Sequence, residues 1–455
     1  MTFLRTCTRM AGPAALLALT LAGGLSPARA ELGSADASWH EALQVVREAG
    51  RDTVGRPDDV VRLDALGDAL VRVGRFADAE RIYRRALVVQ PADHEACAGL
   101  GRIALCTQRD AEAESLLIKA GGAEGAASDL YRALLRRHAW AAAAEMAEEQ
   151  GEGGRREMLE RLAALPAEAG PVGPERAVLQ FQRAWPAPIV HVKLNGQIVS
   201  MVVDPGAGEL LLDPSATRAN HVGVVPGERT VAWSGSRVAA RNAIVQKLEL
   251  GTFALANVPA AVTPLHRYSL EVNPGAPDIA GVIGLPVLER FGVTLDFKRQ
   301  TLELRRSAAT PAAPGARVPF ERWGENELMV YGNIADGRRM AIWLGTGLPG
   351  GGLGASKGTL DELGIQPGKL SNLVRGVGSI LQGAQWSEVM VPSVTLGAVT
   401  RDHVEGWSGA MDTSELWRWG VRRDAVLGPA FFTDRRVTFD WARHELLFED
   451  KPGKP

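Results

Sequence analysis

The apolar residues follow two different spacings along the chain. Between residues 60 and 127 they recur as they do on the packed faces of paired helices. After residue 175 they gather in short runs, separated by Gly, Pro and Asn turns, which is typical of strands. Such runs include Ile189–Leu194, Ile198–Val203 and Val293–Leu304. The pattern therefore predicts a multidomain chain, with an N-terminal helical domain followed by an all-β domain.

The helical part repeats a pattern of small and large residues, in which small residues let paired helices approach and large ones fill the space between them. The first unit carries Leu66, Gly67, Leu70, Gly74, Ala79, Tyr83, Ala86 and Pro91. A second unit, about 34 residues later, carries Leu100, Gly101, Ala104, Ala113, Leu117 and Ala120. The pattern resembles tetratricopeptide repeats, although the second unit lacks a matching Gly and the closing Pro. Further helices are expected at 38–49, 129–149 and 155–164.

Two functions are open for these repeats. Stacked helical hairpins form a groove that suits a peptide or a partner protein. The same stack also serves as a rigid spacer packed on the next domain. The sequence favours neither interpretation over the other.

The β part contains an internal duplication. Met201-Val202-Val203 leads into Asp204-Pro205-Gly206-Ala207, and Ile342-Trp343-Leu344 leads into Gly345-Thr346-Gly347-Leu348, at an offset of 345 − 204 = 141. The same offset relates Gly196 to Gly337 and Gly223 to Gly364. Later anchors drift slightly: Leu250-Gly251 with Leu396-Gly397, Val282–Gly284 with Val426–Gly428, and Val293–Asp296 with Val437–Asp440. A collinear series of this kind indicates two copies of one unit.

Each copy resembles a retropepsin-like aspartic peptidase, and the pair resembles the two-lobed, pepsin-like arrangement. An apolar strand ends in Asp-x-Gly, and the run Ile279–Leu285 followed by Phe291–Asp296 is fairly specific to that family. The resemblance covers roughly residues 175 to 450. It implies a bilobal aspartic-peptidase-like β domain after the tetratricopeptide-like helical hairpins. The expected divisions are a signal peptide at 1–30, helical domain at 31–165, linker at 166–174, lobe 1 at 175–306, inter-lobe linker at 307–316 and lobe 2 at 317–450.

The resemblance also implies a site at which the two Asp-x-Gly turns meet. Family members place one Asp in each lobe, so that the two carboxyls share a proton and act as base and acid on the peptide bond. A Thr or Ser after each Asp bonds to the opposite lobe, and a Gly permits the tight turn. This chain keeps only part of that set.

Both turns depart from the family pattern. The first keeps Asp204 and Gly206 but has Pro205 where a hydroxyl is expected, and proline has no amide hydrogen either. The second keeps Thr346 and Gly347 but has Gly345 in place of the acid. Other acids of lobe 2, Asp336 and Asp361, are not expected at the cleft floor. We therefore expect little peptidase activity, and a lone Asp204 also fits a turn-forming acid held by local hydrogen bonds.

Aromatic residues mark a possible flap over the cleft. In lobe 1 the hairpin of this family is expected near Val231–Val238, with Trp233, Ser234 and Gly235 at its tip. Residues 375–378 are the matching stretch in lobe 2. Trp407, Trp417 and Trp419 are expected in a loop or helix that covers the cleft or docks the helical domain.

Composition and the N-terminus add a location but no cofactor. A net charge of −2 gives no electrostatic reason to expect nucleic acid as a partner. Arg5 and Arg9, the apolar run Ala11–Leu25 and Ala28-Arg29-Ala30 are typical of a cleaved secretory signal, which predicts a periplasmic or extracellular protein without a membrane span after cleavage. Cys97 and Cys106 are expected to be buried thiols of one helical segment, and an oxidising compartment leaves a disulfide between them as the alternative.

No metal or other cofactor is expected. The glycines of Gly345–Gly350 match a dinucleotide fingerprint but lack its parallel βαβ context. His40-Glu41 and His94-Glu95 lack the second His of a metalloprotease helix.

Three functions remain open on the sequence. The favoured one is a non-catalytic module that binds a peptide or protein in the inter-lobe cleft, with a further protein partner on the helical repeats. The alternative is an aspartic endopeptidase that hydrolyses peptide bonds through Asp204. A purely structural scaffold is the third.

Overall fold

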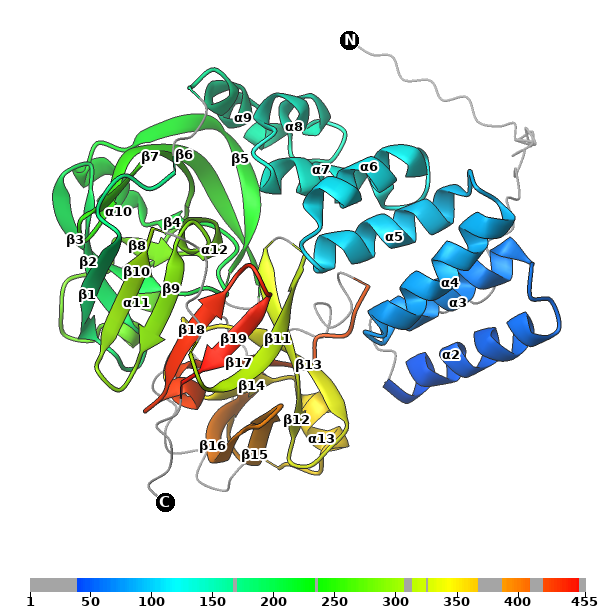
Figure 1. Cartoon of the computed structure of the whole chain (residues 1–455). Coiled ribbons are helices and arrows are strands. Elements are labelled where there is room, and N and C mark those ends of the chain that lie inside the picture. Colours follow the sequence, from blue (N-terminus) through cyan, green and yellow to red (C-terminus); the bar gives the residue numbers. More distant parts are fainter. Residues whose placement is uncertain are drawn as a thin grey trace, which may run out of the picture. The chain divides into compact units, whose positions relative to one another are not determined.

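The computed structural model describes residues 39–166, 170–233, 236–306, 313–324, 326–366, 387–409 and 420–449. Helical repeats precede a β-rich domain in this structure, as the sequence predicts (Figure 1). The expected signal peptide, Ser234, Gly235, residues 375–378, Trp417 and Trp419 lie outside the described residues. Among the described residues, no helix combines the length and the apolar character needed to cross a membrane.

The N-terminal domain is a stack of antiparallel helices. Its helices are α2 (Trp39–Val54), α3 (Val60–Arg72), α4 (Phe76–Val89), α5 (His94–Cys106), α6 (Asp110–Ala120), α7 (Ala126–Arg136), α8 (Trp140–Met146) and α9 (Arg156–Ala163). The side chains of Asp59 and Asp93 accept hydrogen bonds from backbone N–H groups in the first turns of α3 and α5 and so cap these helices. Cys97 and Cys106 are free and buried in α5, which confirms the expected thiols.

Tyr83 shows why the repeat alternates small and large residues. Its ring is fully buried between α3 and α5, against Gly67 and Gly99. A Cβ atom on either glycine would lie 2.4 Å or 2.3 Å, respectively, from a ring carbon, so only glycine lets the helices close on the ring. The hydroxyl donates to Asp68 at 2.6 Å, which satisfies the one polar atom of this side chain.

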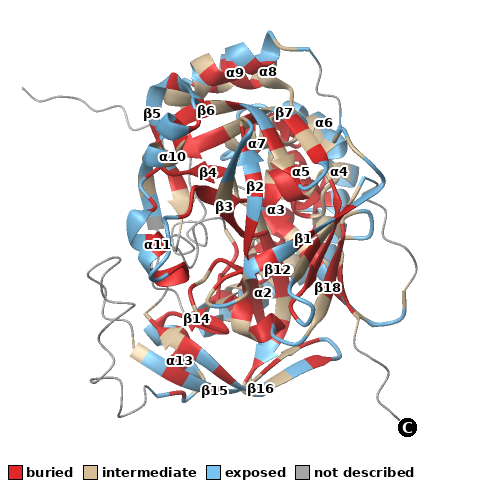
Figure 2. Ribbon diagram, turned by 90° about the vertical axis from the view of Figure 1, so that its left-hand side faces the viewer, coloured by how far each residue is buried: buried red, intermediate tan, exposed pale blue. Residues whose placement is uncertain are grey.

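Lobe 1 is built on one sheet of mixed strands. Its strands are β1 (Arg176–Arg183), β2 (Ile189–Leu194), β3 (Gln197–Val203), β4 (Leu211–Leu212), β5 (Gly223–Trp233), β6 (Ser236–Leu250), β7 (Phe253–Val262) and β8 (Gly281–Ile283). Its helices are α10 (Pro214–Ala219), α11 (His266–Val272) and α12 (Leu285–Leu288). Residues become buried towards the end of β3, where the chain turns into the interior (Figure 2).

Lobe 2 repeats this plan. Its strands are β11 (Ala316–Trp323), β12 (Glu327–Ile334), β13 (Arg339–Leu344), β14 (Leu353–Ala355), β15 (Ser387–Leu396), β16 (Val399–Ser408) and β17 (Ala425–Leu427), with helix α13 (Lys357–Glu362). In lobe 1, β3 runs parallel to β8, with Val202 opposite Val282. In lobe 2, β13 runs parallel to β17, with Trp343 opposite Val426. The anchors of the sequence duplication therefore occupy equivalent strands.

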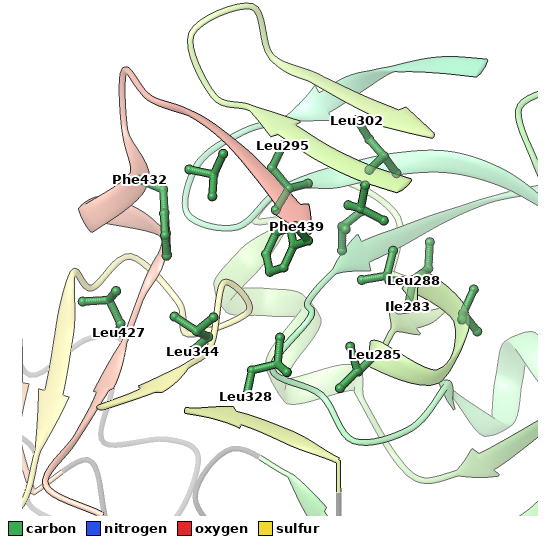
Figure 3. Packing of buried hydrophobic residues seen from close by; sticks show 14 of the residues in the cluster. Ile283, Leu285, Leu288, Leu295, Leu302, Leu328, Leu344, Leu427, Phe432 and Phe439 are labelled. Carbon is green, nitrogen blue, oxygen red and sulfur yellow. The ribbon is translucent and has the colours of Figure 1, made fainter. Parts of the chain in front are cut away.

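A six-stranded antiparallel sheet joins the two lobes, and we call it the central sheet. Its order is β1-β10-β9-β18-β19-β11, with β9 (Gly292–Asp296), β10 (Thr301–Arg305), β18 (Arg436–Asp440) and β19 (Glu445–Phe448). β1 continues into the sheet of lobe 1, and β11 continues into the sheet of lobe 2. Leu295 and Leu302 of lobe 1 and Phe432 and Phe439 of lobe 2 belong to one hydrophobic core (Figure 3).

The helical domain packs on lobe 2. Leu63, Leu70 and Ile103 belong to the same buried cluster as Trp323 and Trp343 of lobe 2. The rings of Phe76 and Trp323 stack with centroids 5.6 Å apart. This packing is the arrangement that the rigid-spacer interpretation requires, and a separate protein partner on the helices stays a prediction.

The Tyr83 contact leads to a test of the helical packing. We expect Gly99→Ala to lower the free energy of unfolding by about 1–3 kcal/mol, because the added methyl group is forced against a fully buried ring. Gly50→Ala is the matched control, since Gly50 lies in α2 with no atom within 4 Å of an added Cβ. There the same change should raise stability by up to about 1 kcal/mol through helix propensity. Equal effects in urea unfolding of both variants would contradict the packing argument.

Candidate functional site

The turn that begins at Asp204 and the corresponding turn that begins at Gly345 contact each other where the lobes meet. Asp204 follows β3, and its backbone N–H donates to Ile283 O at 3.0 Å. Gly345 follows β13, and its N–H donates to Leu427 O at 2.9 Å. A Cβ on Gly206 would lie only 1.8 Å from Leu344 O, so the turn of lobe 1 touches the strand end of lobe 2. The close approach of the two turns therefore depends on glycine.

The family resemblance implies two hydroxyl hydrogen bonds between the lobes, one from each turn, and one of the two is present. The Thr346 hydroxyl donates to Val203 O of the opposite lobe at 2.8 Å and lies 3.4 Å from Asp204 Oδ1. Pro205 stands at the reciprocal position and has no hydroxyl to return the bond. Thr346 is buried, so its bond is shielded from water. Of these two hydrogen bonds between the lobes, the structure therefore keeps only the one donated by Thr346.

Asp204 is enclosed by hydrogen-bond donors. It is 5% exposed, and its Oδ1 accepts the N–H of Gly206 at 3.0 Å. Burial raises the pKa of this carboxyl, and the N–H groups of Gly206, Gly347 and Thr346 with the Thr346 hydroxyl partly offset that rise, giving a pKa of about 6. No carboxyl is among the largest causes of this shift, which are burial and hydrogen bonds. The raised pKa of Asp204 is therefore not the signature of two acids that share a proton.

Opposite Asp204, the part of lobe 2 that the structure describes offers no replacement acid. A Cβ on Gly345 would meet the Val426 Cγ1 atom at 2.9 Å and nothing else closer than 3.9 Å. Asp336 lies in the turn between β12 and β13, and Asp361 pairs with Lys357 along α13. The structure therefore places both acids on peripheral elements of lobe 2.

Tyr268 completes the site, and sequence reasoning did not find it. This residue of α11 is buried, and its hydroxyl donates to Gly347 O at 2.6 Å. An imagined Cβ on Gly347 would lie 2.5 Å from Asp204 Oδ2 and 3.1 Å from the Tyr268 hydroxyl, so both groups flank the same glycine. Burial and the Asp204 charge raise the pKa of Tyr268 well above its usual range. Tyr268 therefore stays a neutral donor beside Asp204.

The stretch in which we expected a flap lies at the end of the hairpin formed by β5 and β6, and its role as a flap stays a prediction. Trp233 ends β5 and pairs with Ser236, which begins β6. The Trp233 ring meets the Tyr268 ring edge-on, with centroids 4.9 Å apart. The hairpin end is thus linked to Asp204 through Tyr268. Trp407, which we expected in a loop or helix, lies instead on strand β16, because the alternation of buried and exposed residues runs on through Ser408.

A largely buried ion cluster connects the Asp204 loop with the hairpin and the helical domain. Glu209, five residues after Asp204, accepts hydrogen bonds from Arg155 of the helical domain and from Arg229 of β5. Burial would raise the pKa of Glu209, but the two guanidinium groups outweigh it and lower the pKa to about 2. Arg229 also donates to Asn242 of β6 at 2.7 Å, and Asn242 donates to Gly154 O. No local sequence signal links these residues.

Two family models match this chain, one in the β domain and the other in the helical domain. Residues 190–287 match the family model described as aspartyl protease, and residues 60–103 match the tetratricopeptide repeat model. Both family resemblances proposed from the sequence are thereby confirmed. No curated protein matches the chain.

Among solved structures, the chain is similar to several aspartic-protease-like proteins. An aspartic proteinase from Irpex lacteus shares 11% identity, with 61% of this chain and 97% of that chain covered and a TM-score of 0.39. Basic 7S globulin from soybean shares 12% identity, with 62% and 95% covered and a TM-score of 0.33. A retropepsin-like aspartic protease from Rickettsia conorii shares 17% identity, with 31% and 95% covered and a TM-score of 0.21.

The raised pKa of Asp204 predicts a pH-dependent stability. A carboxyl whose pKa rises from 3.8 to about 6 on folding favours the folded state below pH 4, and that contribution is lost as the pH rises to about 6. The loss amounts to about 3 kcal/mol for the shift of roughly two pKa units. We expect the loss of stability between pH 4 and pH 7, measured by urea unfolding, to be smaller by this amount in Asp204→Asn, while other buried acids such as Glu271 keep their part. Asp361→Asn, a change on the surface of α13, should keep the full loss.

The Glu209 cluster predicts a large loss of stability. Glu209→Gln leaves Arg155 and Arg229 without their shared carboxylate, and breaking a buried pair in this way costs about 3–5 kcal/mol. Glu157→Gln removes the partner of Arg161 on the exposed face of α9 and should cost less than about 1 kcal/mol. Thermal unfolding at neutral pH measures both. A loss no greater than that of the control would show that the cluster does not hold the domains together.

Proposed function

We propose that the chain is an exported, non-catalytic protein with an aspartic-protease-like fold that binds a peptide or protein segment between its two lobes. The observation that carries the proposal is the environment of Asp204. Its carboxyl faces Gly347 and Tyr268, and glycine stands at the position of the second acid. The segment 1–30, with its apolar run and Ala28-Arg29-Ala30, supports export.

Peptide hydrolysis by this fold requires two carboxyls in different protonation states. One removes a proton from water while the other donates to the peptide carbonyl. Asp204 has no such partner among the described residues, and Tyr268 cannot exchange protons near neutral pH because its pKa is raised. General acid–base assistance is worth about 10² to 10⁴-fold, so a site with one acid falls well short of the two-acid reaction.

The hairpin supports binding as the remaining role. β5 and β6 pair from Gly223–Ile244 to Trp233–Ser236, and beyond Arg241, where the pairing of β6 with β7 ends, they form a two-stranded ribbon. Trp233 at its end is half-buried and packs on Tyr268. Such an aromatic surface beside backbone strands suits an extended peptide, since strands supply main-chain hydrogen bonds and aromatics supply contact area.

An active aspartic endopeptidase is the second candidate, and one observation favours it. With a pKa of about 6, Asp204 changes protonation in the mildly acidic range where such enzymes work, and Thr346 still holds the opposite lobe. This reading requires a second proton donor that the described residues near Asp204 do not include.

Cleavage and binding of a broad peptide library between pH 3 and pH 7 separate these functions. We expect no cleavage by the mature protein or by Asp204→Asn, while peptides are retained by both. Trp233→Ala should weaken retention about tenfold or more, because it removes the aromatic contact of the hairpin. Trp140→Ala is the matched control, since Trp140 is also half-buried but lies in the helical domain.

Two other outcomes of this experiment would indicate a different function. Cleavage that disappears in Asp204→Asn would establish the endopeptidase and overturn the proposal. Neither cleavage nor retention of any peptide would leave the structural scaffold as the function.

A further inference from the structure

A cavity of about 320 Å³ lies where the helical domain meets lobe 2, away from Asp204. Its walls come from α5, from α7 and from the end of β11. Its charged and aromatic lining residues are Arg102, Arg132, Arg136, Arg322, Asp129 and Trp323. Four guanidinium groups and a single carboxylate therefore face one small space.

The repeat explains how the arginines come together. Arg102 and Arg136 are 136 − 102 = 34 residues apart, which is the repeat period, so they occupy equivalent positions on α5 and α7, the first helices of two successive repeats. Arg132 lies one turn before Arg136 on α7. Residues four apart share a helix face, so Arg132 and Arg136 project to the same side. Arg322 reaches the cavity from β11 of the neighbouring lobe.

Asp129 balances two of these charges. Its Oδ2 accepts from Arg102 Nε at 2.9 Å, and its Oδ1 accepts from Arg132. Glu289 of lobe 1 holds Arg322 through a pair of hydrogen bonds at 2.6 and 3.2 Å. Asp129 and Glu289 thus compensate the charges of three of the four arginines.

The positive charge of Arg136 is less well compensated by carboxylates than the charges of the other three arginines. Its side chain is 2% exposed, and its nearest carboxylate oxygen, on Asp110, is 3.6 Å away. Its hydrogen bonds go to neutral oxygens, including Leu105 O at 2.8 Å and Asn326 Oδ1 at 3.3 Å. Burial and the nearby charge of Arg322 lower the pKa of Arg136 to about 10. Positive charges thus crowd at this end of the cavity.

Trp323 supplies a second, independent indication. It is 3% exposed, and its indole N–H meets no acceptor among the described residues. A buried donor without a partner costs free energy, and such donors normally meet a bonded group. Trp323 lines the cavity, so an acceptor bound there is the candidate partner for this N–H.

We propose that this cavity binds an anion with several oxygen atoms, either a carboxylate or a phosphate, through Arg132, Arg136 and the Trp323 indole N–H. Guanidinium groups match both oxyanions because their N–H donors lie in a planar fork. The walls belong to the helical domain and to lobe 2, so the bound anion stabilises the packing of one on the other. This site is separate from the cleft and does not rest on the function proposed above.

Titration of the mature full-length chain with inorganic phosphate and with acetate tests the site. Sodium chloride keeps the ionic strength constant, and calorimetry and thermal unfolding are the readouts. We expect saturable binding and a rise in Tm that chloride alone does not give. Trp323→Phe removes only the indole donor and keeps a ring beside Phe76, and it should weaken binding about tenfold.

Arg132→Gln is the second variant and should also weaken binding about tenfold. Arg161→Gln is the matched control, because Arg161 pairs with an acid four residues away on an exposed helix face outside the cavity. It should leave binding unchanged. Acetyl-trialanine with a free or an amidated C-terminus distinguishes the sources: tighter binding of the free acid than of phosphate indicates a peptide terminus, and the reverse indicates free phosphate.

Two results would overturn the proposal. One is an equal loss of binding in Arg161→Gln. The other is the absence of saturable binding in the parent chain, and a variant in which Asp412 and Glu415, which precede Gly420 in the sequence, are both neutralised then tests the reason. Binding seen only after Asp412→Asn and Glu415→Gln would show that the chain's own acids compete for the arginines, and not an external anion.

Discussion

The central sheet is the constraint on which the rest of the structure depends. β9 of lobe 1 and β18 of lobe 2 pair antiparallel, with Thr294 directly opposite Thr438 at the midpoint of the six strands. Their hydroxyls lie 2.8 Å apart in a fully buried position. Thr438 donates its proton to Glu449, so Thr294 must donate to Thr438. Because β1 and β11 run from this sheet into each lobe, the lobes cannot separate without breaking it, and the turns at Asp204 and Gly345 are held together.

This constraint explains which parts of the site are needed by the fold and which are not. Gly206 must stay small because Leu344 O of the other lobe lies against it, and Thr346 holds Val203 O across the interface. The fold makes no such demand for a carboxylate at Gly345, whose backbone bond to Leu427 forms without a side chain. A chain can therefore lack the second acid and keep the architecture, whereas replacing Gly206 or Thr346 would disturb the contact between lobes.

Much of the fold could be predicted from the sequence because it is encoded by local spacing. Ile189–Leu194 reads as a strand from its own residues, and the duplicated turns reveal two lobes. The contacts that could not be predicted join segments that are far apart along the chain. Tyr268 is 79 residues from Gly347, and Arg155 is 54 residues from Glu209, so no spacing along the chain pairs them. Trp407 was misplaced because a cluster of tryptophans suggested a loop more strongly than the strand alternation around it suggested β16.

The helical domain contributes more than a spacer between segments of chain. It meets lobe 2 through a buried apolar cluster, and it meets lobe 1 through Arg155 and the backbone of Gly154. A Cβ on Gly154 would lie 2.0 Å from Glu228 O, which places the helical turn directly against the bulge of β5. Arg229 follows that bulge and shares Glu209 with Arg155. Movement at the base of the β5–β6 hairpin would therefore strain a charge cluster anchored in the helical domain, which couples the hairpin that carries Trp233 to the position of the helices.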